Sequence, residues 1–393
     1  MTKILHTSDW HLGSTLYGYD RHDEMLAMLR QMEQIVEEEQ PDLFLLSGDI
    51  YHNAQAPASV QQWLSNFLVT LHDKAPEMDI VMTAGNHDSG ARHDIFSKPW
   101  SRFRVHSFGL LDRQRLFEHH VLHFPGKAWV VALPYFYANE EGFAQVFNTL
   151  MEEVERRNTQ LEPVVAMAHI TVGGCDFTGH RRVGTATVGG LDAVDAGRLK
   201  GDPDYVALGH IHHAQWLGHS HRWRYSGSPL PVSFDENYEH SVSIININHH
   251  GDEPTLEKIA IQPLRPLKTL PEKGFGQWDE VIRTLKEFPE DEEAYIRLNV
   301  NAHDGLPPAP DVEARQAVEG KRCRYCVINI EHTEAEERIQ HDMDIHDFRQ
   351  AEPVDIIKLY TKETEQPFTD DMEKLFAQVV DEVRAEEKKR NRL

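Results

Sequence analysis

The sequence predicts an α/β protein whose layered sheet carries a functional site along its strand ends. Two apolar, strand-like runs at 3–7 and 42–47 flank a segment whose apolar residues recur at helical spacing from Met25 to Val36, which gives a β-α-β beginning. Further short apolar runs follow, most of them ending in polar residues with glycine. They lie at 79–83, 128–133, 164–168, 205–208, 223–225 and 241–247. Such repeated strand exits are typical of sheets that bind ligands at the carboxyl ends of their strands.

Length and composition favour a globular protein of more than one domain. The chain has 393 residues, of which 40% are apolar and 26% are charged, and single cores stop growing at roughly 250–300 residues. No run approaches the ~20 consecutive apolar residues of a membrane helix, so no membrane association is expected. The first residues begin a strand and lack the zones of a signal peptide, so we expect a cytoplasmic location.

Changes in composition divide the chain into three predicted parts. Residues 1–265 contain the strand exits described above, and a proline-containing stretch at 261–266 follows them. Residues 266–335 predict a small α+β unit, with helices at 276–288 and 311–318 and strands at 294–300 and 324–330. Residues 336–393 predict helices with an apolar stripe, formed by Met372, Leu375, Phe376, Val379 and Val383. This stripe either packs on its own domain or docks a partner, and both interpretations stay open.

Cysteines and net charge exclude some classes of protein. Three cysteines are too few for a disulfide framework. Cys323 and Cys326 have the spacing of half a zinc ribbon, but no second pair completes it, and ordinary strand cysteines are the better interpretation. A formal charge of −24 argues against binding nucleic acid through a broad basic face. If DNA is the substrate, cations or a partner must supply much of the positive charge.

The stretch "MTAGNHDSG" places an amide, an imidazole and a carboxylate at one strand exit. The apolar run 80–84 ends there in Asn86, His87 and Asp88, whereas a surface turn needs only Gly-Asn or Asp-Gly. Residues of the same types follow other apolar runs. They are Asp9, His11, Asp49, His52, His169, His210 and His212.

This mixture of residue types suits a metal site. Carboxylate and amide oxygens together with imidazole nitrogens favour divalent manganese, iron or zinc over calcium. A single carboxylate such as Asp49 can bridge two cations, and paired cations are used to hydrolyse phosphoesters. Each fragment alone is weak in a chain with 25 histidines. Their joint occurrence at strand exits is what predicts a metal site.

Five stretches carry a family resemblance. They are "HTSDWHLG", "LLSGDIYH", "GNHDS", "ALGHIHHAQ" and "YSGSPLPVSFDE". Together they resemble the calcineurin-like metallophosphoesterase superfamily and, within it, the SbcD family of bacterial nucleases; the last stretch is the discriminating one. The resemblance is strong over residues 1–265 and covers the remainder in outline. It implies a four-layer α/β/β/α sandwich with a small α+β capping domain and C-terminal helices.

The resemblance also implies roles for the strand-exit residues. One metal ion would be held by Asp9, His11, Asp49 and His212. The second would be held by Asp49, Asn86, His169 and His210. His87 would meet the phosphate and assist the leaving oxygen, and Asp88 would orient its ring. His52 would contact substrate, or alternatively cap the next helix.

The activity implied is that of a DNA nuclease with two divalent ions, Mn²⁺ being favoured. It would act as a 3′–5′ exonuclease and as an endonuclease at hairpins and ends, in DNA repair and recombination. Its expected partners are an SbcC-type ATPase, bound through the C-terminal helices, and a second copy of the chain within a heterotetramer. The apolar residues of the predicted helix 57–71 fit either a dimer contact or a core-facing helix. Arg181 and Arg182 fit either phosphate contacts or a solvated loop.

Two rival functions stay open at this point. A phosphatase or a cyclic-nucleotide phosphodiesterase could use the same strand-exit residues, although it would need neither a capping domain nor docking helices. A DNA-end scaffold without activity would keep the metals for shape, but the presence of both His87 and His212 argues against it.

Overall fold

The computed structural model describes most of the chain and divides it into two compact units. The described residues are 1–178, 187–188, 191–218, 221–303 and 305–331, with isolated positions at 357, 369, 372–374, 376 and 380. The first unit comprises Met1–Thr269, Pro289–Arg297 and Gly320–Cys326, and the second comprises Leu270–Phe288, Leu298–Glu319 and the chain from Val327 onward. The predicted domain boundaries at 265/266 and 335/336 stay predictions. The second of them falls outside the described residues.

One six-stranded sheet of the first unit contains the beginning of the chain. Its order is β16-β15-β1-β4-β5-β6, and its strands are β1 (Thr2–Thr7), β4 (Leu43–Ser47), β5 (Asp79–Thr83), β6 (Val105–Phe108), β15 (Ser241–Ile247) and β16 (Thr255–Ala260). The four strands β1, β4, β5 and β6 are parallel, while β15 is antiparallel to β1. The carboxyl ends of β1, β4 and β5 therefore meet at one edge of this sheet.

The second six-stranded sheet has a parallel centre as well. Its order is β13-β14-β12-β9-β8-β7, and its strands are β7 (Val121–Phe124), β8 (Ala128–Ala132), β9 (Val164–His169), β12 (Tyr205–Gly209), β13 (Gln215–Trp216) and β14 (Trp223–Tyr225). Strands β8, β9, β12 and β14 run parallel. Buried side chains of β8, β9 and β12 lie on both faces of the sheet, as expected for a sheet that is covered on both sides.

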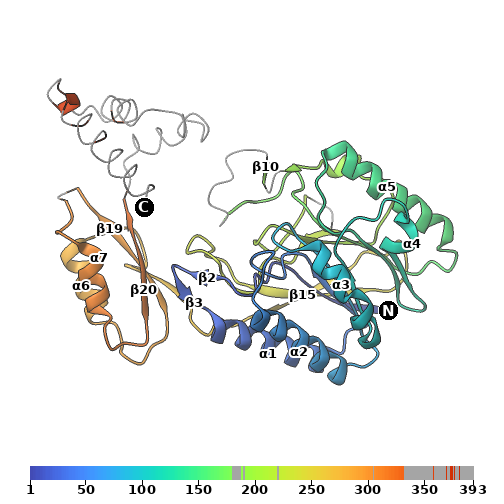
Figure 1. Ribbon diagram of the computed structural model, residues 1–393, viewed down its shortest axis with the longest axis horizontal. Coiled ribbons are helices and arrows are strands. Elements are labelled where there is room, and N and C mark those ends of the chain that lie inside the picture. The colour runs from blue at the N-terminus through green and yellow to red at the C-terminus, as the bar shows by residue number, and fades with distance from the viewer. Residues whose placement is uncertain are drawn as a thin grey trace, which may run out of the picture. The chain divides into compact units, whose positions relative to one another are not determined.

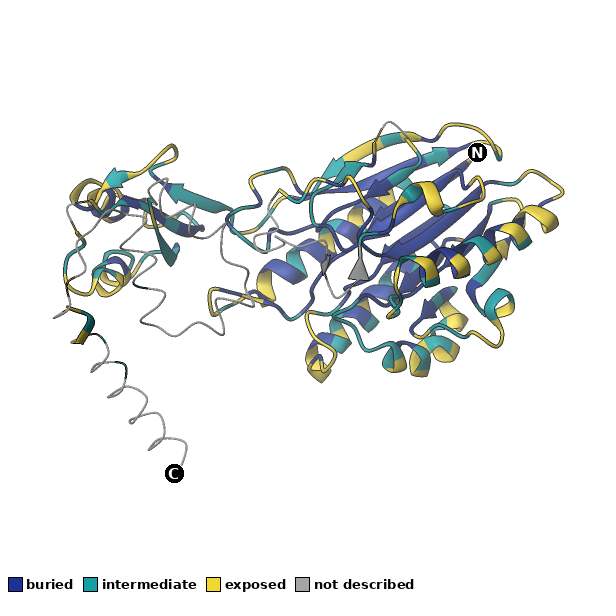
Figure 2. Ribbon diagram, turned by 90° about the horizontal axis from the view of Figure 1, so that it is seen from above, coloured by how far each residue is buried: buried dark blue, intermediate teal, exposed yellow. Residues whose placement is uncertain are grey.

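The two sheets and their helices form four layers (Figure 1). Helices α1 (His22–Glu39) and α2 (Ala58–Lys74) pack on the first sheet, and α5 (Glu140–Arg157) packs on the second. A third apolar cluster lies between the sheets and combines residues such as Leu45 and Val81 with Val130 and Met167. Figure 2 shows buried strands between helices whose outer faces are exposed. The predicted α/β/β/α sandwich is confirmed.

Shorter elements complete the first unit. They are the helices α3 (Gly90–Trp100) and α4 (Leu116–His120), the 3-10 turns at Ser101–Phe103 and Ala196–Arg198, and the two-residue strands β2 (Thr15–Leu16), β3 (Tyr19–Asp20), β10 (Thr187–Val188) and β11 (Leu191–Asp192). Helix α3 buries only His93.

Helix α2 shows which interpretation of the 57–71 stretch is right. Its residues Val60, Leu64, Phe67 and Leu68 are buried, and all four belong to the core beneath the first sheet. Because a side chain inside the core cannot contact a second copy of the chain, these residues form a core-facing stripe. The alternative prediction, that these four residues form a dimer contact, is wrong.

The small α+β unit predicted at 266–335 has the expected elements. Helices α6 (Trp278–Lys286) and α7 (Pro310–Ala317) accompany a sheet in which β19 (Tyr295–Asn301) is flanked by β17 (Leu267–Leu270) and β18 (Gly276–Gln277), with β20 (Arg324–Ile330) also paired to β19. Helix α6 buries Trp278, Val281, Ile282 and Leu285, which follow helical spacing.

Some expectations fall outside the described residues. They include Arg181, Arg182 and most of the stripe from Met372 to Val383. Across the described part of the chain, no helix has both the length and the apolar character that crossing a bilayer demands.

Asp79 at the start of β5 predicts an acid-dependent contribution to stability. Its carboxylate accepts hydrogen bonds from Arg104 at 2.8 Å and Lys127 at 3.0 Å, and His106 lies 3.5 Å away. Burial alone would raise the pKa of Asp79, but these partners outweigh burial and lower it to about 2. A lowered folded-state pKa stabilises the protein above the ordinary value near 3.8, and this stabilisation is lost as the pH falls towards 2.

We therefore expect Asp79→Asn to lower the free energy of unfolding by about 1–2 kcal/mol at pH 7. The difference from wild type should shrink below pH 4, because protonation then removes the same charge from the wild-type protein. Urea unfolding with a chelator, at several pH values, measures both quantities. Asp73→Asn, at an exposed position of α2, is the control. A difference that stays constant down to pH 3 would contradict the assignment.

Candidate metal centre

The predicted site residues come together where the carboxyl ends of both sheets meet. Asp9 and His11 follow β1, Asp49 follows β4, and Asn86 to Asp88 follow β5. From the second sheet, His169 ends β9, and His210 and His212 follow β12. The imidazole of His169 reaches across to the first sheet, where its Nδ1 lies 2.9 Å from the carbonyl oxygen of Ser47. All seven predicted ligands thus lie in one region.

Four of the predicted ligands have left-handed backbone conformations. The φ angles are +54° at Asp9, +46° at His11, +50° at Asp49 and +96° at His210. Non-glycine residues adopt such conformations at a cost of about 1–3 kcal/mol each, and they do so mainly at functional sites. The turn at each strand exit directs the side chain towards the centre of the cluster. Four of the nine non-glycine residues with positive φ in the described part of the chain are therefore predicted ligands, while the other five lie elsewhere.

Two glycines allow the strand exits to approach closely. A Cβ on Gly48, whose φ is +82°, would lie 2.2 Å from Nδ1 of His169. A Cβ on Gly85 would lie 2.1 Å from Oδ1 of Asp49. Both distances are far below van der Waals contact, so a larger residue at either position would displace a predicted ligand.

The first group of ligand atoms surrounds His11. Donor atoms of Asp9, His11 and His212 lie within 4.8 Å of one another. The Nε2 atoms of His11 and His212 are 3.3 Å apart, and Nε2 of His11 is 3.7 Å from Oδ2 of Asp49. The other nitrogen of His212, Nδ1, lies 3.1 Å from the carboxylate of Glu236. Donation from Nδ1 to this carboxylate would leave Nε2, which faces His11, as the nitrogen of His212 that could hold a metal ion.

The second group surrounds the amide oxygen of Asn86. This Oδ1 lies 3.0 Å from Nε2 of His169 and 3.0 Å from Nδ1 of His210. Nε2 of His169 is also 3.4 Å from Oδ2 of Asp49. Asp49 therefore contacts both groups. Asp9 lies near both as well, because its donor atoms are within 4.8 Å of those of Asp49 and His169 and its carboxylate accepts the backbone N–H of His210 at 3.0 Å. The other oxygen of Asp49, Oδ1, accepts the backbone N–H of His87 at 2.8 Å.

Burial and charge act against each other in this cluster. Burial alone would raise the pKa of Asp49, but His169 and His11 hold it well below its usual range. Burial lowers the pKa of His169, and Asp49 outweighs this effect and raises it to about 9. Burial lowers the pKa of His11 far below its ordinary value, so its imidazole is neutral. The surroundings of Asp49 thus favour positive charge beside it, while His11 supplies an uncharged donor.

This donor set fits divalent cations. Nitrogen lone pairs and acidic or amide oxygens converge in a buried place, and Nδ1 of His11 has no hydrogen-bond partner in the described parts of the chain. Imidazole, carboxylate and amide together suit manganese, iron or zinc. Which ion each side chain would hold stays a prediction.

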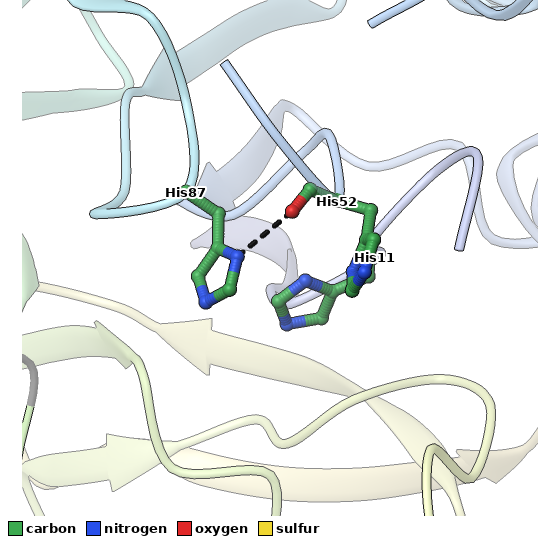
Figure 3. Close-up of side chains that lie close together, drawn as sticks. All are labelled: His11, His52 and His87. Atoms are coloured by element: carbon green, nitrogen blue, oxygen red, sulfur yellow. Dashed lines mark hydrogen bonds between the residues drawn. The ribbon is translucent and has the colours of Figure 1, made fainter. Parts of the chain in front are cut away.

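His87 and His52 lie beside the first group (Figure 3). Nδ1 of His87 donates to the backbone carbonyl oxygen of His52 at 2.8 Å, and the two rings are stacked with centroids 5.9 Å apart. The ring of His11 contacts that of His87 edge-on at 4.9 Å. His52 does not cap the next helix, because α2 begins after Pro57 and has no side-chain cap. Both histidines are therefore available to a substrate at this edge.

The predicted role of Asp88 as the group that orients the His87 ring is wrong. Its carboxylate accepts backbone N–H groups of Ile50 at 3.1 Å, Tyr51 at 2.8 Å and Gly85 at 2.9 Å. The bonds from Ile50 and Tyr51 tie the exit of β4 to that of β5, and the bond from Gly85 lies within the exit of β5. Asp88 thus braces the loops that carry Asp49 and Asn86. The carbonyl group of His52 holds the His87 ring instead.

Sequence reasoning missed the role of Glu236. This residue is buried, and Oε1 contacts His212 while Oε2 accepts the backbone N–H of Val232 at 3.1 Å. It lies at the end of the stretch "YSGSPLPVSFDE", which was informative only as a family signature. The stretch gave no signal that singled out Glu236, because another acidic residue, Asp235, directly precedes it.

Comparisons with known proteins agree with this geometry. The model of the family described as calcineurin-like phosphoesterase matches residues 2–214, more than half of the chain. A second family model, described as type 5 capsule protein repressor C-terminal domain, matches residues 263–365. The SbcD component of the nuclease SbcCD from Bacillus subtilis is 30% identical over 324 residues, which cover 77% of this chain and 80% of that protein. The chain belongs to the SbcD family of calcineurin-like phosphoesterases.

Other SbcD relatives are similar over a comparable span. The protein of the same name from Rhodobacter capsulatus is 30% identical over 309 residues, covering 72% of this chain and 75% of the relative. That of Escherichia coli K12 is 28% identical over 298 residues, covering 68% and 70%. Among solved structures, a dimetal phosphatase from Danio rerio matches 67% of this chain and 99% of its own, with 13% identity and a TM-score of 0.38. Membership of the family makes the chain a metal-dependent phosphoesterase.

Proposed function

We propose that this chain is a metal-dependent DNA nuclease that hydrolyses phosphodiester bonds at DNA ends and hairpins. The single observation that carries the proposal is the pair of donor groups joined by Asp49 at the meeting point of two sheets. The names of the SbcD relatives supply the substrate class, because they describe components of a nuclease. Exonuclease action from 3′ to 5′ and endonuclease action at hairpins are the modes that we infer from the family.

The proposed cofactor is a pair of divalent cations, with manganese as the favoured metal. Asp9, His11 and His212 would hold one ion, Asn86, His169 and His210 the other, and Asp49 would contact both. Bound cations supply charge neutralisation for a phosphate and activation of a water molecule. The residues of the chain position these donors, and the strained strand exits keep them convergent without a substrate.

His87 is the proposed group that handles the leaving oxygen. Because its Nδ1 donates to the carbonyl of His52, the remaining nitrogen, Nε2, is the one that can reach a substrate. A histidine with one nitrogen fixed and the other available is suited to stabilise or protonate an oxygen that leaves phosphorus. His52, stacked beside it, is proposed to contact the same phosphate.

We also propose how the chain works in the cell. The relatives are named as parts of SbcCD, so an SbcC-type ATPase is the proposed partner, bound through residues 336–393. A net charge of −24 supports this division of labour, since the partner would supply much of the affinity for DNA. A homodimer within a heterotetramer, a cytoplasmic location and a role in DNA repair and recombination belong to the same proposal.

The test is cleavage of end-labelled DNA by wild type and His87→Gln. Duplex and hairpin DNA are incubated with Mn²⁺, Mg²⁺ or chelator, and metal content is measured in parallel. We expect Mn²⁺-dependent cleavage that falls by about 10²–10⁴-fold in the variant, because a positioned acid contributes that much. Metal content should stay at the wild-type level, since His87 is not a predicted ligand.

A phosphomonoester is the comparison substrate. Hydrolysis of the monoester without cleavage of DNA would favour a phosphatase and contradict the proposal. If no DNA is cut even with the ATPase partner and Mn²⁺ present, the chain is not a nuclease. If His87→Gln cleaves as fast as wild type, the role of His87 is wrong although the activity stands.

A further inference from the structure

The 230–236 segment, Leu230 to Glu236, carries the residue that orients His212. It belongs to neither a helix nor a strand and lies between β14 and β15. Glu236 contacts His212 through Oε1 at 3.1 Å and accepts the N–H of Val232 through Oε2 at 3.1 Å. Because both oxygens are engaged, the position of Glu236 sets the direction of the His212 ring.

A turn fixes Glu236 to its neighbour Asp235. The backbone N–H of Glu236 donates to the carbonyl oxygen of Ser233 at 3.2 Å, and the N–H of Asp235 donates to the hydroxyl of Ser233 at 3.2 Å. The three residues therefore move together. A displacement at Asp235 reaches Glu236 directly.

Two arginines from distant parts of the first unit hold this segment. Arg21, just before α1, donates through Nη1 to the carbonyl oxygen of Pro231 at 2.8 Å. Arg297, on β19, donates through Nη1 to Oδ1 of Asp235 at 3.1 Å. A segment without ladder hydrogen bonds depends on such contacts for its position.

The planar guanidinium group of Arg297 makes three contacts. Besides the bond to Asp235, its Nε donates to the hydroxyl of Thr269 at 3.2 Å, and its guanidinium lies 5.2 Å from the ring centre of Phe234. The side chains of Arg297 and Asp235 are only 16% and 20% exposed, so salt screens this ion pair less than a pair on the open surface. A lysine at position 297 would keep the positive charge, but it has neither the several N–H donors of a guanidinium nor a planar group that can stack on an aromatic ring.

We propose that Arg297 is a positioning residue of the metal centre, acting through Asp235 and Glu236 on His212. The proposal rests on the proposed function, because it needs a metal-binding role for His212. Loss of Arg297 should weaken Mn²⁺ binding by the donor group of Asp9, His11 and His212 and leave Mn²⁺ binding by the group around Asn86 unchanged. A residue that only stabilised the fold would affect both groups alike.

The experiment compares Mn²⁺ binding to the full chain by calorimetry in wild type, Glu236→Gln, Arg297→Gln and Arg297→Lys. Glu236→Gln is expected to lower one of the two Mn²⁺ affinities by about 10–100-fold, and so identifies the His212 group. Arg297→Gln should lower the same affinity by about three- to tenfold and leave the other within about twofold, with Arg297→Lys in between.

The double variant tests whether the residues form one chain of contacts. If Arg297 acts through Glu236, adding Arg297→Gln to Glu236→Gln changes the affinity no further. Arg102→Gln is the matched control, because Arg102 is exposed and its side chain forms no hydrogen bond or ion pair within the described residues. The Tm of the metal-free proteins is recorded for every variant.

Each outcome decides a separate question. Equal weakening of both affinities by Arg297→Gln, or a lower Tm with both affinities unchanged, overturns the positioning role alone. Additive effects in the double variant also overturn it. Failure of the wild-type chain to bind Mn²⁺ overturns the proposed function and this inference with it.

Discussion

Replacing Asp49 by asparagine is expected to lower DNA cleavage by at least about 10³-fold, because this carboxylate contacts both donor groups. It is buried, and its Oδ2 lies 3.4 Å from His169 and 3.7 Å from His11. Asparagine keeps the shape and the contact to the N–H of His87 but removes the negative charge. Two cations that share a neutral ligand repel each other more strongly, so we expect fewer than two Mn²⁺ ions to bind.

The measurement is Mn²⁺ stoichiometry by calorimetry together with cleavage of labelled duplex DNA. Asp73→Asn, the exposed substitution on α2, removes the same charge without touching the site and should behave as wild type. Circular dichroism of the metal-free proteins separates loss of ligand from loss of fold. Cleavage within tenfold of wild type, with two ions bound, would show that Asp49 does not bridge the two groups.

Gly85→Ala is expected to abolish cleavage and to destabilise the protein, although it adds a single methyl group. The new Cβ would lie 2.1 Å from Oδ1 and 2.3 Å from the backbone nitrogen of Asp49. Because backbone atoms cannot move aside without disturbing the strand exit, the loop carrying Asp49 must shift. We expect the free energy of unfolding to fall by about 1–3 kcal/mol and Mn²⁺ affinity to fall with it.

Gly173→Ala provides the matched substitution. Gly173 also follows a strand that ends at the site, but a Cβ there would meet only the carbonyl oxygen of Val194 at 3.8 Å, an ordinary contact. Urea unfolding and DNA cleavage of the two variants therefore separate the steric effect from the loss of a glycine. Equal behaviour of Gly85→Ala and Gly173→Ala would refute the close-packing argument.

Central strands were predictable because burial on both faces produces continuous apolar runs. The predicted runs 3–7, 42–47 and 79–83 correspond to β1, β4 and β5. Edge strands give a weaker signal, since one side faces solvent. Strand β16 contains no buried residue and gives no apolar run. Strand β6, at Val105–Phe108, is mostly buried, but its polar residues His106 and Ser107 interrupt the apolar run. Both strands are absent from the sequence-based prediction.

Helices were predicted less completely than strands. Helix α5 is absent from the prediction, although Phe143, Phe147, Leu150 and Val154 are buried and follow helical spacing. Its many charged residues mask that stripe. Helix α3 offered no such stripe, because it buries only His93. Amphipathic periodicity was thus present in one missed helix and missing from the other.

The clustering of the predicted ligand side chains could be foreseen from the sequence, and their supporting contacts could not. Parallel strands bring their carboxyl ends together, so residues at those ends must lie close. In contrast, the partners of Asp88 and Glu236 depend on how irregular loops pack, and no periodicity encodes that. This is why Asp88 proved to bind backbone N–H groups, and why the contact of Glu236 with His212 appears only in three dimensions.

The left-handed turns at Asp9, His11, Asp49 and His210 restrict how this centre could be redesigned or could evolve. Among residues with a Cβ, aspartate, asparagine and histidine tolerate this conformation best, whereas β-branched and bulky side chains resist it. Glutamate and cysteine are good metal ligands elsewhere, yet here they would add backbone strain to any change in coordination. The choice of residues that could serve as the predicted ligands at these positions is therefore limited by the path of the main chain as well as by the preferences of a metal.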